Sequence, residues 1–280
     1  MTGAWRVPAR LAPVVMAVRA RDSRAAVGRT NLVGWLFVAM VAVLAECGIR
    51  LVDLHDSVAA PSAAVGALAT ELWSGDLAGE IGTTLEAYVQ GLVLAIAIGV
   101  AAGVLLGTSR TLHDASSVVL EFLRPIPGVA LIPVAILAFG LDTPMRRFVI
   151  AYAAVWPVLI ATLYGVNGRD RTLDDVARMS GVGRAGTLVR VTLPGALPSI
   201  AAGIRLSASV ALLVAVTVEF VVGLDGIGAY MERQQLAFRI PELYGAVLLV
   251  AALGYVVNVG LRSAQRRAVF WAGEERVGSP

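Results

Sequence analysis

The chain has 280 residues, of which 58% are hydrophobic and 15% are charged, and its mean hydropathy is +0.77. Soluble domains are typically about 45–50% apolar and about 25% charged, so this composition argues against a soluble globular enzyme and favours a membrane protein. All 23 basic residues are arginine, which excludes a P-loop and every lysine-dependent reaction. The chain therefore cannot itself supply a standard ATP-hydrolysing site.

Cysteine and histidine are rare in this chain. The one cysteine, Cys47, excludes an intrachain disulfide and a multi-cysteine metal site. His55 and His113 lie far apart, on segments that we expect to be solvent-facing loops. We therefore expect no catalytic residues, no metal site and no cofactor. The isoelectric point near 9.4 reflects arginines that flank apolar segments and set membrane topology, rather than a nucleic-acid surface.

The N-terminal region combines a basic tail with an apolar segment. Residues 1–30 contain six arginines and no uninterrupted apolar run. Residues 31–49 are apolar and match the roughly 20 residues that a membrane helix needs. Because no small-residue cleavage site follows, we predict an uncleaved first span. Residues 50–79 are predicted to form an exposed connection with a helical patch at its middle.

The second predicted span, residues 87–107, contains no charged residue. Small residues recur in it at every fourth position, which places them on one face of a helix and allows close approach of a second backbone. The pattern predicts tight helix packing, either within one subunit or across a dimer. The residues of this stripe are Gly91, Ala95, Gly99, Gly103 and Gly107.

The third predicted span, about 118–140, follows a short polar turn at 108–117 and contains Pro125, Pro127 and Pro133. Prolines are tolerated in membrane helices where neighbouring groups satisfy the freed carbonyls. We therefore expect this helix to be broken at its start and packed inside the protein.

Three further apolar runs complete the predicted architecture, which is all-α and polytopic with six transmembrane helices. They cover 148–166, about 200–222 and 243–261, so a transmembrane domain at 31–262 would lie between the tail at 1–30 and a second tail at 263–280. With six spans, both termini lie on one side. That side carries sixteen arginines and the other carries five, so the positive-inside rule predicts that both termini are cytoplasmic.

Residues 168–199 interrupt the apolar runs with Asp, Arg, Gly and Pro, and the same arginine count places them in the cytoplasm. Thr172 and Asp175 have the spacing of a capping box, which predicts the start of a short helix. Gly181 and Gly183 are predicted to end it in left-handed conformations. A second short helix is expected at about 185–192, ending at Pro194. Two capped helices favour a docking surface over a passive spacer.

The same segment resembles the cytoplasmic loop of ABC importer permeases. That loop has the pattern Glu-Ala-Ala, three residues, Gly, nine residues, Ile, one residue, Leu-Pro. Here Asp175, Val176 and Ala177 are followed at matching spacings by Gly181, by Val191, and by the pair that ends the motif, Leu193 and Pro194. The segments "LRPIPGVALIPVAILAFG" (123–140), "LPGALPSIAAGIRLS" (193–207) and "EFVVGLDGIGAY" (219–230) are similar to the nitrate/sulfonate/taurine branch of that family. The resemblance covers nearly all of residues 61–261.

This resemblance implies a type I importer permease fold and a non-catalytic subunit in the cell membrane. Two permease copies, with a homodimer as the default, would form the pathway for a small anionic or polar organic solute. Two cytoplasmic ABC ATPase subunits would drive transport, and an extracytoplasmic binding protein would deliver the solute. The helix from Asp175 to Gly181 would be the coupling helix that contacts the ATPase. No nucleic-acid partner is implied.

Five charged residues lie in or beside the apolar runs: Glu46, Glu121, Arg124, Arg205 and Glu219. A charge at the bilayer centre costs roughly 2.5–3.5 kcal/mol on insertion scales, so each should face protein or water. Glu121 and Arg124 have the i, i+3 spacing of an ion pair. Arg124, Arg205 and Glu219 are candidate residues of a translocation path. Snorkelling of both arginines to the interface and a structural hydrogen bond for Glu219 are the alternatives.

Two other functions remain open at this point. A secondary transporter working without an ATPase would need intramembrane coupling carboxylates and internal repeats, and no convincing repeat is present. A membrane enzyme would need a clustered His/Asp/Ser or metal-binding set, which the sequence does not contain.

Overall fold

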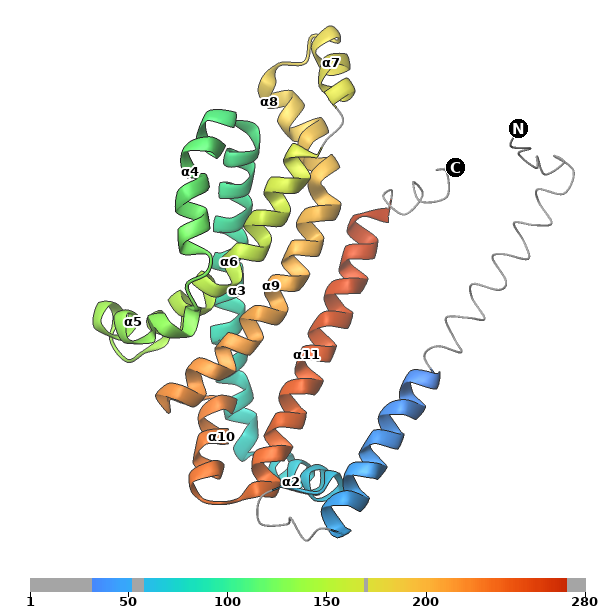
Figure 1. Ribbon diagram of the computed structural model, residues 1–280, viewed down its shortest axis with the longest axis vertical. Coiled ribbons are helices and arrows are strands. Elements are labelled where there is room, and N and C mark those ends of the chain that lie inside the picture. The colour runs from blue at the N-terminus through green and yellow to red at the C-terminus, as the bar shows by residue number, and fades with distance from the viewer. Residues whose placement is uncertain (1–31, 52–57, 169–170, 271–280) are drawn as a thin grey trace, which may run out of the picture. The chain divides into compact units, whose positions relative to one another are not determined.

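The computed structural model describes residues 32–51, 58–168 and 171–270, and these contain helices and no strand (Figure 1). Within them, five helices are long and apolar enough to cross a membrane: Leu32–Leu51, Leu77–Thr108, Thr143–Asn167, Arg184–Val222 and Ile240–Ala268. A sixth span results if one bent helix pair counts as a single crossing. The predicted all-α polytopic fold is therefore confirmed, and the six predicted spans correspond to counting the bent pair as one crossing. The predicted tail at 1–30 lies outside the described residues.

The first apolar helix, Leu32–Leu51, has a mean hydropathy of 2.2 over its most apolar window. Its one carboxylate is held by local contacts. Glu46 accepts hydrogen bonds from Arg50 Nε at 2.8 Å, from Ser62 Oγ at 2.7 Å and from the Ser62 backbone N–H at 3.0 Å. Charge-assisted hydrogen bonds of this kind satisfy a carboxylate at the end of an apolar helix.

The chain divides into two compact units, and the second begins at Ala64. Three long helices form the core of this second unit: α3 (Asp76–Thr108), α6 (Thr143–Asn167) and α9 (Leu193–Val222). The small-residue stripe of α3 packs against α6 of the same chain. A Cβ atom added to Gly103 would lie 2.6 Å from Thr162 Cβ and 2.8 Å from the Leu159 carbonyl oxygen. A Cβ atom added to Gly203 of α9 would lie 2.5 Å from Ala161 Cβ of α6. The predicted tight packing is thus an interaction within one subunit.

The predicted third span is a helix pair bent by 83°, made of α4 (Arg110–Leu123) and the segment Gly128–Phe139, which contains a 3₁₀ turn η1 (Gly128–Leu131) and α5 (Ile132–Phe139). Pro125 and Pro127 lie in the break, as expected, because proline lacks the N–H that would continue a helix. Pro133 lies in the first turn of α5, where that N–H is not needed.

Two expectations for this region are wrong. Residues 110–117 are helical, not a turn, because Ser109 caps α4 by accepting a hydrogen bond from Leu112 N–H. The pair is also not packed inside the chain: α4 has no buried residue, and only Ile132 and Ala135 of α5 are buried.

The remaining helices gather where α3 begins and α9 ends. They are α2 (Pro61–Ser74), α10 (Ile227–Leu236) and α11 (Ile240–Ala268). Leu68 of α2 packs against an apolar cluster that includes Leu77, Ile227 and Leu249. α2 fits the expected helical patch in the 50–79 connection, whereas α10 was not predicted. α11 runs to Ala268, beyond the predicted domain end at residue 262.

Candidate functional site

The polar segment between α6 and α9 contains a short exposed helix, α7 (Arg171–Met179). Figure 1 shows α7 and the following helix α8 (Arg184–Thr187) at one end of the bundle. A hollow of about 730 Å³ beside them is lined by residues that include Thr108 at the end of α3, Arg178 and Arg184. This end of the molecule therefore combines a free helix with a concave basic surface.

The C-terminus of α7 has the hydrogen bonds of a Schellman motif. Val182 N–H donates to the Ala177 carbonyl at 2.9 Å, and Gly181 N–H donates to the Arg178 carbonyl at 3.1 Å. Gly181 has a φ of +74°, which is the left-handed conformation predicted for it. The same prediction for Gly183 is wrong, because its φ of −66° is extended and it precedes α8.

Two other local predictions need correction. α7 begins at Arg171, so Thr172 lies in the first turn instead of capping the helix from outside. The second short helix does not end at Pro194. α8 continues through a π-helical turn (Leu188–Thr192) into α9, and Pro194 lies in the first turn of α9. A π-turn that directly precedes the proline accommodates its missing N–H without ending the helix.

The motif residues lie on different sides of this segment. Asp175 is exposed and pairs with Arg178 at 3.1 Å, whereas Ala177 is buried. Leu193 and Pro194 are half-buried at the start of α9. Leu173, Val176 and Met179 recur at every third position and are all exposed, Val176 by 48% and Met179 by 81%. α7 therefore presents apolar side chains to its surroundings, which is typical of an interaction surface.

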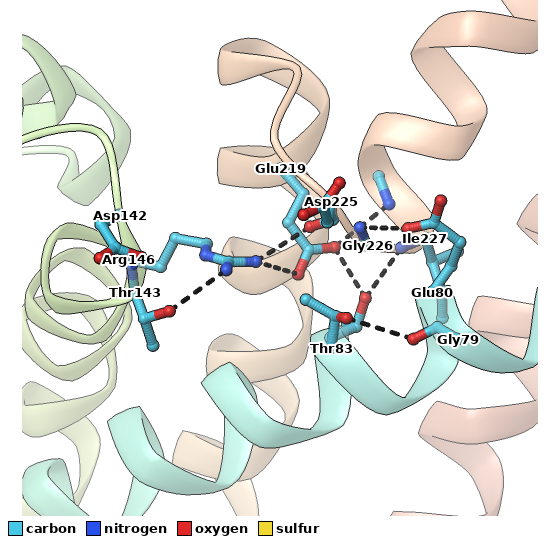
Figure 2. A network of polar contacts seen from close by, with 12 residues as sticks. Gly79, Glu80, Thr83, Asp142, Thr143, Arg146, Glu219, Asp225, Gly226 and Ile227 are labelled. Atoms are coloured by element: carbon cyan, nitrogen blue, oxygen red, sulfur yellow. Dashed lines mark hydrogen bonds and ion pairs between the residues drawn. The ribbon is translucent and has the colours of Figure 1, made fainter.

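A buried polar network lies at the opposite end of α6 and α9 (Figure 2). At its centre is Glu219 of α9, whose exposure is 0%. Glu219 Oε2 accepts a hydrogen bond from Thr84 Oγ1 at 2.8 Å and one from the Gly228 N–H at 3.2 Å. Thr84 Oγ1 accepts in turn from the Ile227 N–H at 2.8 Å. The network thus joins α3 and α9 to the loop between α9 and α10.

Arg146 connects α6 to this network. Its side chain is 8% exposed, and Nη1 lies 3.8 Å from Glu219 Oε1 and donates to the Asp225 carbonyl at 2.9 Å. Nη2 lies 3.4 Å from Thr143 Oγ1. Two buried opposite charges with additional hydrogen-bond partners compensate the cost of removing each from water. All four helices around the loop are therefore connected by polar contacts.

The segment Gly223–Gly228, which links α9 to the first turn of α10, fits around Glu219 because two of its three glycines, Gly226 and Gly228, allow close backbone approach. Gly226 has a φ of +129°, and a Cβ atom there would overlap the Glu219 carboxylate. A Cβ atom on Gly228 would overlap the Val216 carbonyl. On the outer side of the loop, Glu80 of α3 accepts from the Gly226 N–H and pairs with Arg233 of α10. Glycine is thus required where the backbone must approach the carboxylate.

On α10, burial raises the pKa of the Tyr230 phenol above its usual range, and the nearby Glu71 carboxylate adds to this rise. Tyr230 is therefore neutral at physiological pH. No group of three or more His, Cys, Asp or Glu side chains that could hold a metal ion occurs among the described residues.

The three candidate path residues are not brought together. Glu219 belongs to the buried network, which matches the structural alternative for it. Arg205 is half-buried within α9, and Arg124 is exposed at the end of α4. In the part of the chain that the structure describes, no ion pair joins Glu121 to Arg124, so the pair proposed from their spacing is absent.

The sequence analysis did not identify Arg146, Thr84 or Glu80 as members of the network. Arg146 entered only as one of the five arginines on the less basic side of the predicted topology. One available signal was the glycine-rich stretch directly after a carboxylate in an apolar span. Such a stretch indicates a backbone that folds closely around that carboxylate.

Comparisons with known proteins agree with this architecture. A probable ABC transporter permease protein of Brucella melitensis is 32% identical over 202 residues, which cover 72% of this chain and 82% of the relative. A bicarbonate transport system permease protein of Synechococcus elongatus is 32% identical over 176 residues, covering 62% and 63%. The structure of the MetNI methionine ABC transporter in an inward-facing conformation matches with a TM-score of 0.61 at 17% identity, covering 69% of this chain and 95% of that chain.

The model of the family described as "Binding-protein-dependent transport system inner membrane component" matches residues 95–269. This match covers α4 to α11, including α7 and most of the helices that meet in the polar network. The chain therefore belongs to the family of binding-protein-dependent transport system inner membrane components, the multi-pass permeases of ABC transporters.

Proposed function

We propose that this permease forms the translocation pathway for a small anionic or polar solute and that α7 is its coupling helix. An external binding protein would deliver the solute, two cytoplasmic ABC ATPases would drive transport, and a second copy of this chain would complete the pathway. The bicarbonate permease among its relatives supports an anionic solute. Without lysine, the chain leaves ATP hydrolysis to the partner subunits.

The observation that carries the proposal is the construction of α7. Three apolar side chains, Leu173, Val176 and Met179, are exposed on a helix that ends in a Schellman motif. The helix is followed, through α8 and the π-turn, by the continuous helix α9. A displacement of α7 would therefore be transmitted to α9, which extends to the opposite end of the bundle.

The experiment compares two glycine-to-proline variants in the same turn. Gly181→Pro is incompatible with a φ of +74° and should fray α7, whereas Gly183→Pro suits a φ of −66°. In complexes reconstituted with the ATPase and binding protein, we expect Gly181→Pro to lose uptake and substrate-stimulated ATP hydrolysis while membrane expression stays normal. Gly183→Pro should retain both. Full uptake by Gly181→Pro would show that the segment is a passive loop.

We also propose that both termini and α7 are cytoplasmic, as the arginine distribution predicts. Reporter fusions placed after Arg29 and after Arg267 should both give a cytoplasmic signal. A signal from outside the cell membrane at either position would contradict this orientation and with it the contact between α7 and an ATPase.

A further inference from the structure

A groove between α4 and α6 is lined by polar residues as well as by Leu120, Leu159, Ile160 and Leu163. Its volume is about 270 Å³. The polar residues on the α4 wall are separated by four, four and three positions, which places them on one face of the helix. They are His113, Ser117, Glu121 and Arg124, and α6 adds Trp156 and Tyr164.

The two charged side chains in this groove have no partner in the described part of the chain. Neither Glu121 nor Arg124 makes a side-chain hydrogen bond or an ion pair there, although they are neighbours on α4. Two further wall atoms, His113 Nδ1 and Trp156 Nε1, are shielded and also lack a partner. Both charged side chains are exposed, so they are accessible to a ligand as well as to water. The groove therefore offers a ligand one unpaired carboxylate, that of Glu121, and one unpaired guanidinium, that of Arg124.

The position of the groove suits a solute in transit. α4 starts at the end of the bundle that bears α7 and α8 (Figure 1). Its 14 residues extend about 21 Å before the helix breaks beside Arg124. The groove thus leads from the break in the bent pair towards the end of the bundle that bears α7 and α8.

We propose that the groove between α4 and α6 is a solute subsite for small zwitterions. Arg124 binds the acidic group, and Glu121 binds the ammonium group. Side chains at i and i+3 lie about 5–6 Å apart at their Cβ atoms, which places both charged groups within reach of one small zwitterion. A simple anion would gain from Arg124 but would be repelled by Glu121. This assignment rests on the proposed function, because it requires that the chain forms a solute pathway.

The test measures binding to the purified full-length permease in lipid nanodiscs by tryptophan fluorescence. The zwitterions are β-alanine and taurine, and the matched anions are 3-hydroxypropanoate and isethionate, in which a hydroxyl replaces the ammonium. We expect a saturable change with at least one zwitterion and binding at least about tenfold weaker for its hydroxyl analogue, because charge-assisted contacts are the stronger ones. The signal should vanish in Trp156→Phe, which would locate the binding in the groove.

Two variants separate the roles of the charges. Glu121→Gln should weaken the zwitterions about tenfold and leave the anions unchanged, whereas Arg124→Gln should weaken both. The proposal is overturned if no zwitterion gives a saturable change, if the signal persists in Trp156→Phe, or if the two variants act alike. It is also overturned if either variant dissociates permease dimers in light scattering, since the groove would then be a subunit contact. Because the assay contains no ATPase or binding protein, its failure is distinct from failure of the coupling proposal.

Discussion

The two ends of α6 and α9 are stabilised in different ways. At the α7 end, the contacts are local: the Schellman turn spans six residues from Ala177 to Val182, and the ion pair joins Asp175 to Arg178. At the other end, long-range contacts of Glu219, Thr84 and Arg146 join residues that are 73 to 143 positions apart in the chain. The α7 end is therefore stabilised by contacts within one short segment, whereas the other end is stabilised by contacts that join four helices.

This difference also separates stability from coupling. Exposed ion pairs contribute about 0–1 kcal/mol, whereas breaking a buried pair costs about 3–5 kcal/mol because the remaining charge is left uncompensated. Changes at the network should therefore act on folding, and changes at α7 should act on transport with little effect on folding. The following variants test this contrast.

The largest effect is expected for Glu219→Ala, which leaves Arg146 without its opposite charge and Thr84 without an acceptor. We expect a loss of about 3–5 kcal/mol in stability, seen as a large fall in thermal unfolding temperature in detergent. The double variant Glu219→Leu with Arg146→Met should recover part of this loss, because neither charge then remains buried. Glu242→Ala, which removes an exposed pair with Arg239, is the control and should change little.

If Glu219→Ala unfolds at the temperature of the unsubstituted protein, the polar network does not contribute the stability assigned to it. The contrast between the two ends would then disappear.

An intermediate effect is expected for Gly103→Leu, which lies on the seam between α3 and α6. Overpacking a tight contact typically costs about 1–3 kcal/mol, and the neighbouring Leu159 carbonyl is backbone that cannot rotate away. Gly99→Leu should act in the same direction. Gly260→Leu is the matched control, because no atom lies within 4 Å of a Cβ at that position. Thermal unfolding in detergent measures all three, and equal stability of Gly103→Leu and Gly260→Leu would contradict close packing of the seam.

The smallest effect on stability is expected for Asp175→Asn. It removes only the exposed pair with Arg178, so the unfolding temperature should stay nearly constant. Uptake by the reconstituted transporter should fall, because the carboxylate lies on the helix proposed to contact the ATPase. A clear loss of thermal stability would instead mean that Asp175 has a structural role, and the separation between the two ends would be weaker than inferred.

The sequence alone determined the features that depend on neighbouring residues. Apolar runs identify the spans because the bilayer tests each segment by its own composition. Gly181 and the pair Pro125 and Pro127 identify a turn and a break because backbone geometry is a local property. The stripe on α3 predicts close packing because its residues share one helix face.

Only the tertiary structure decided which segments meet. It assigned the α3 stripe to α6, and it showed that α8 runs through a π-turn into α9, where local rules had placed a helix end at Pro194. It also showed that Glu219 is enclosed by Thr84, Arg146 and the glycine-rich segment after α9. Sequence patterns report one helix at a time, whereas these partners are chosen by the packing of several helices at once, and that packing depends on residues more than a hundred positions apart.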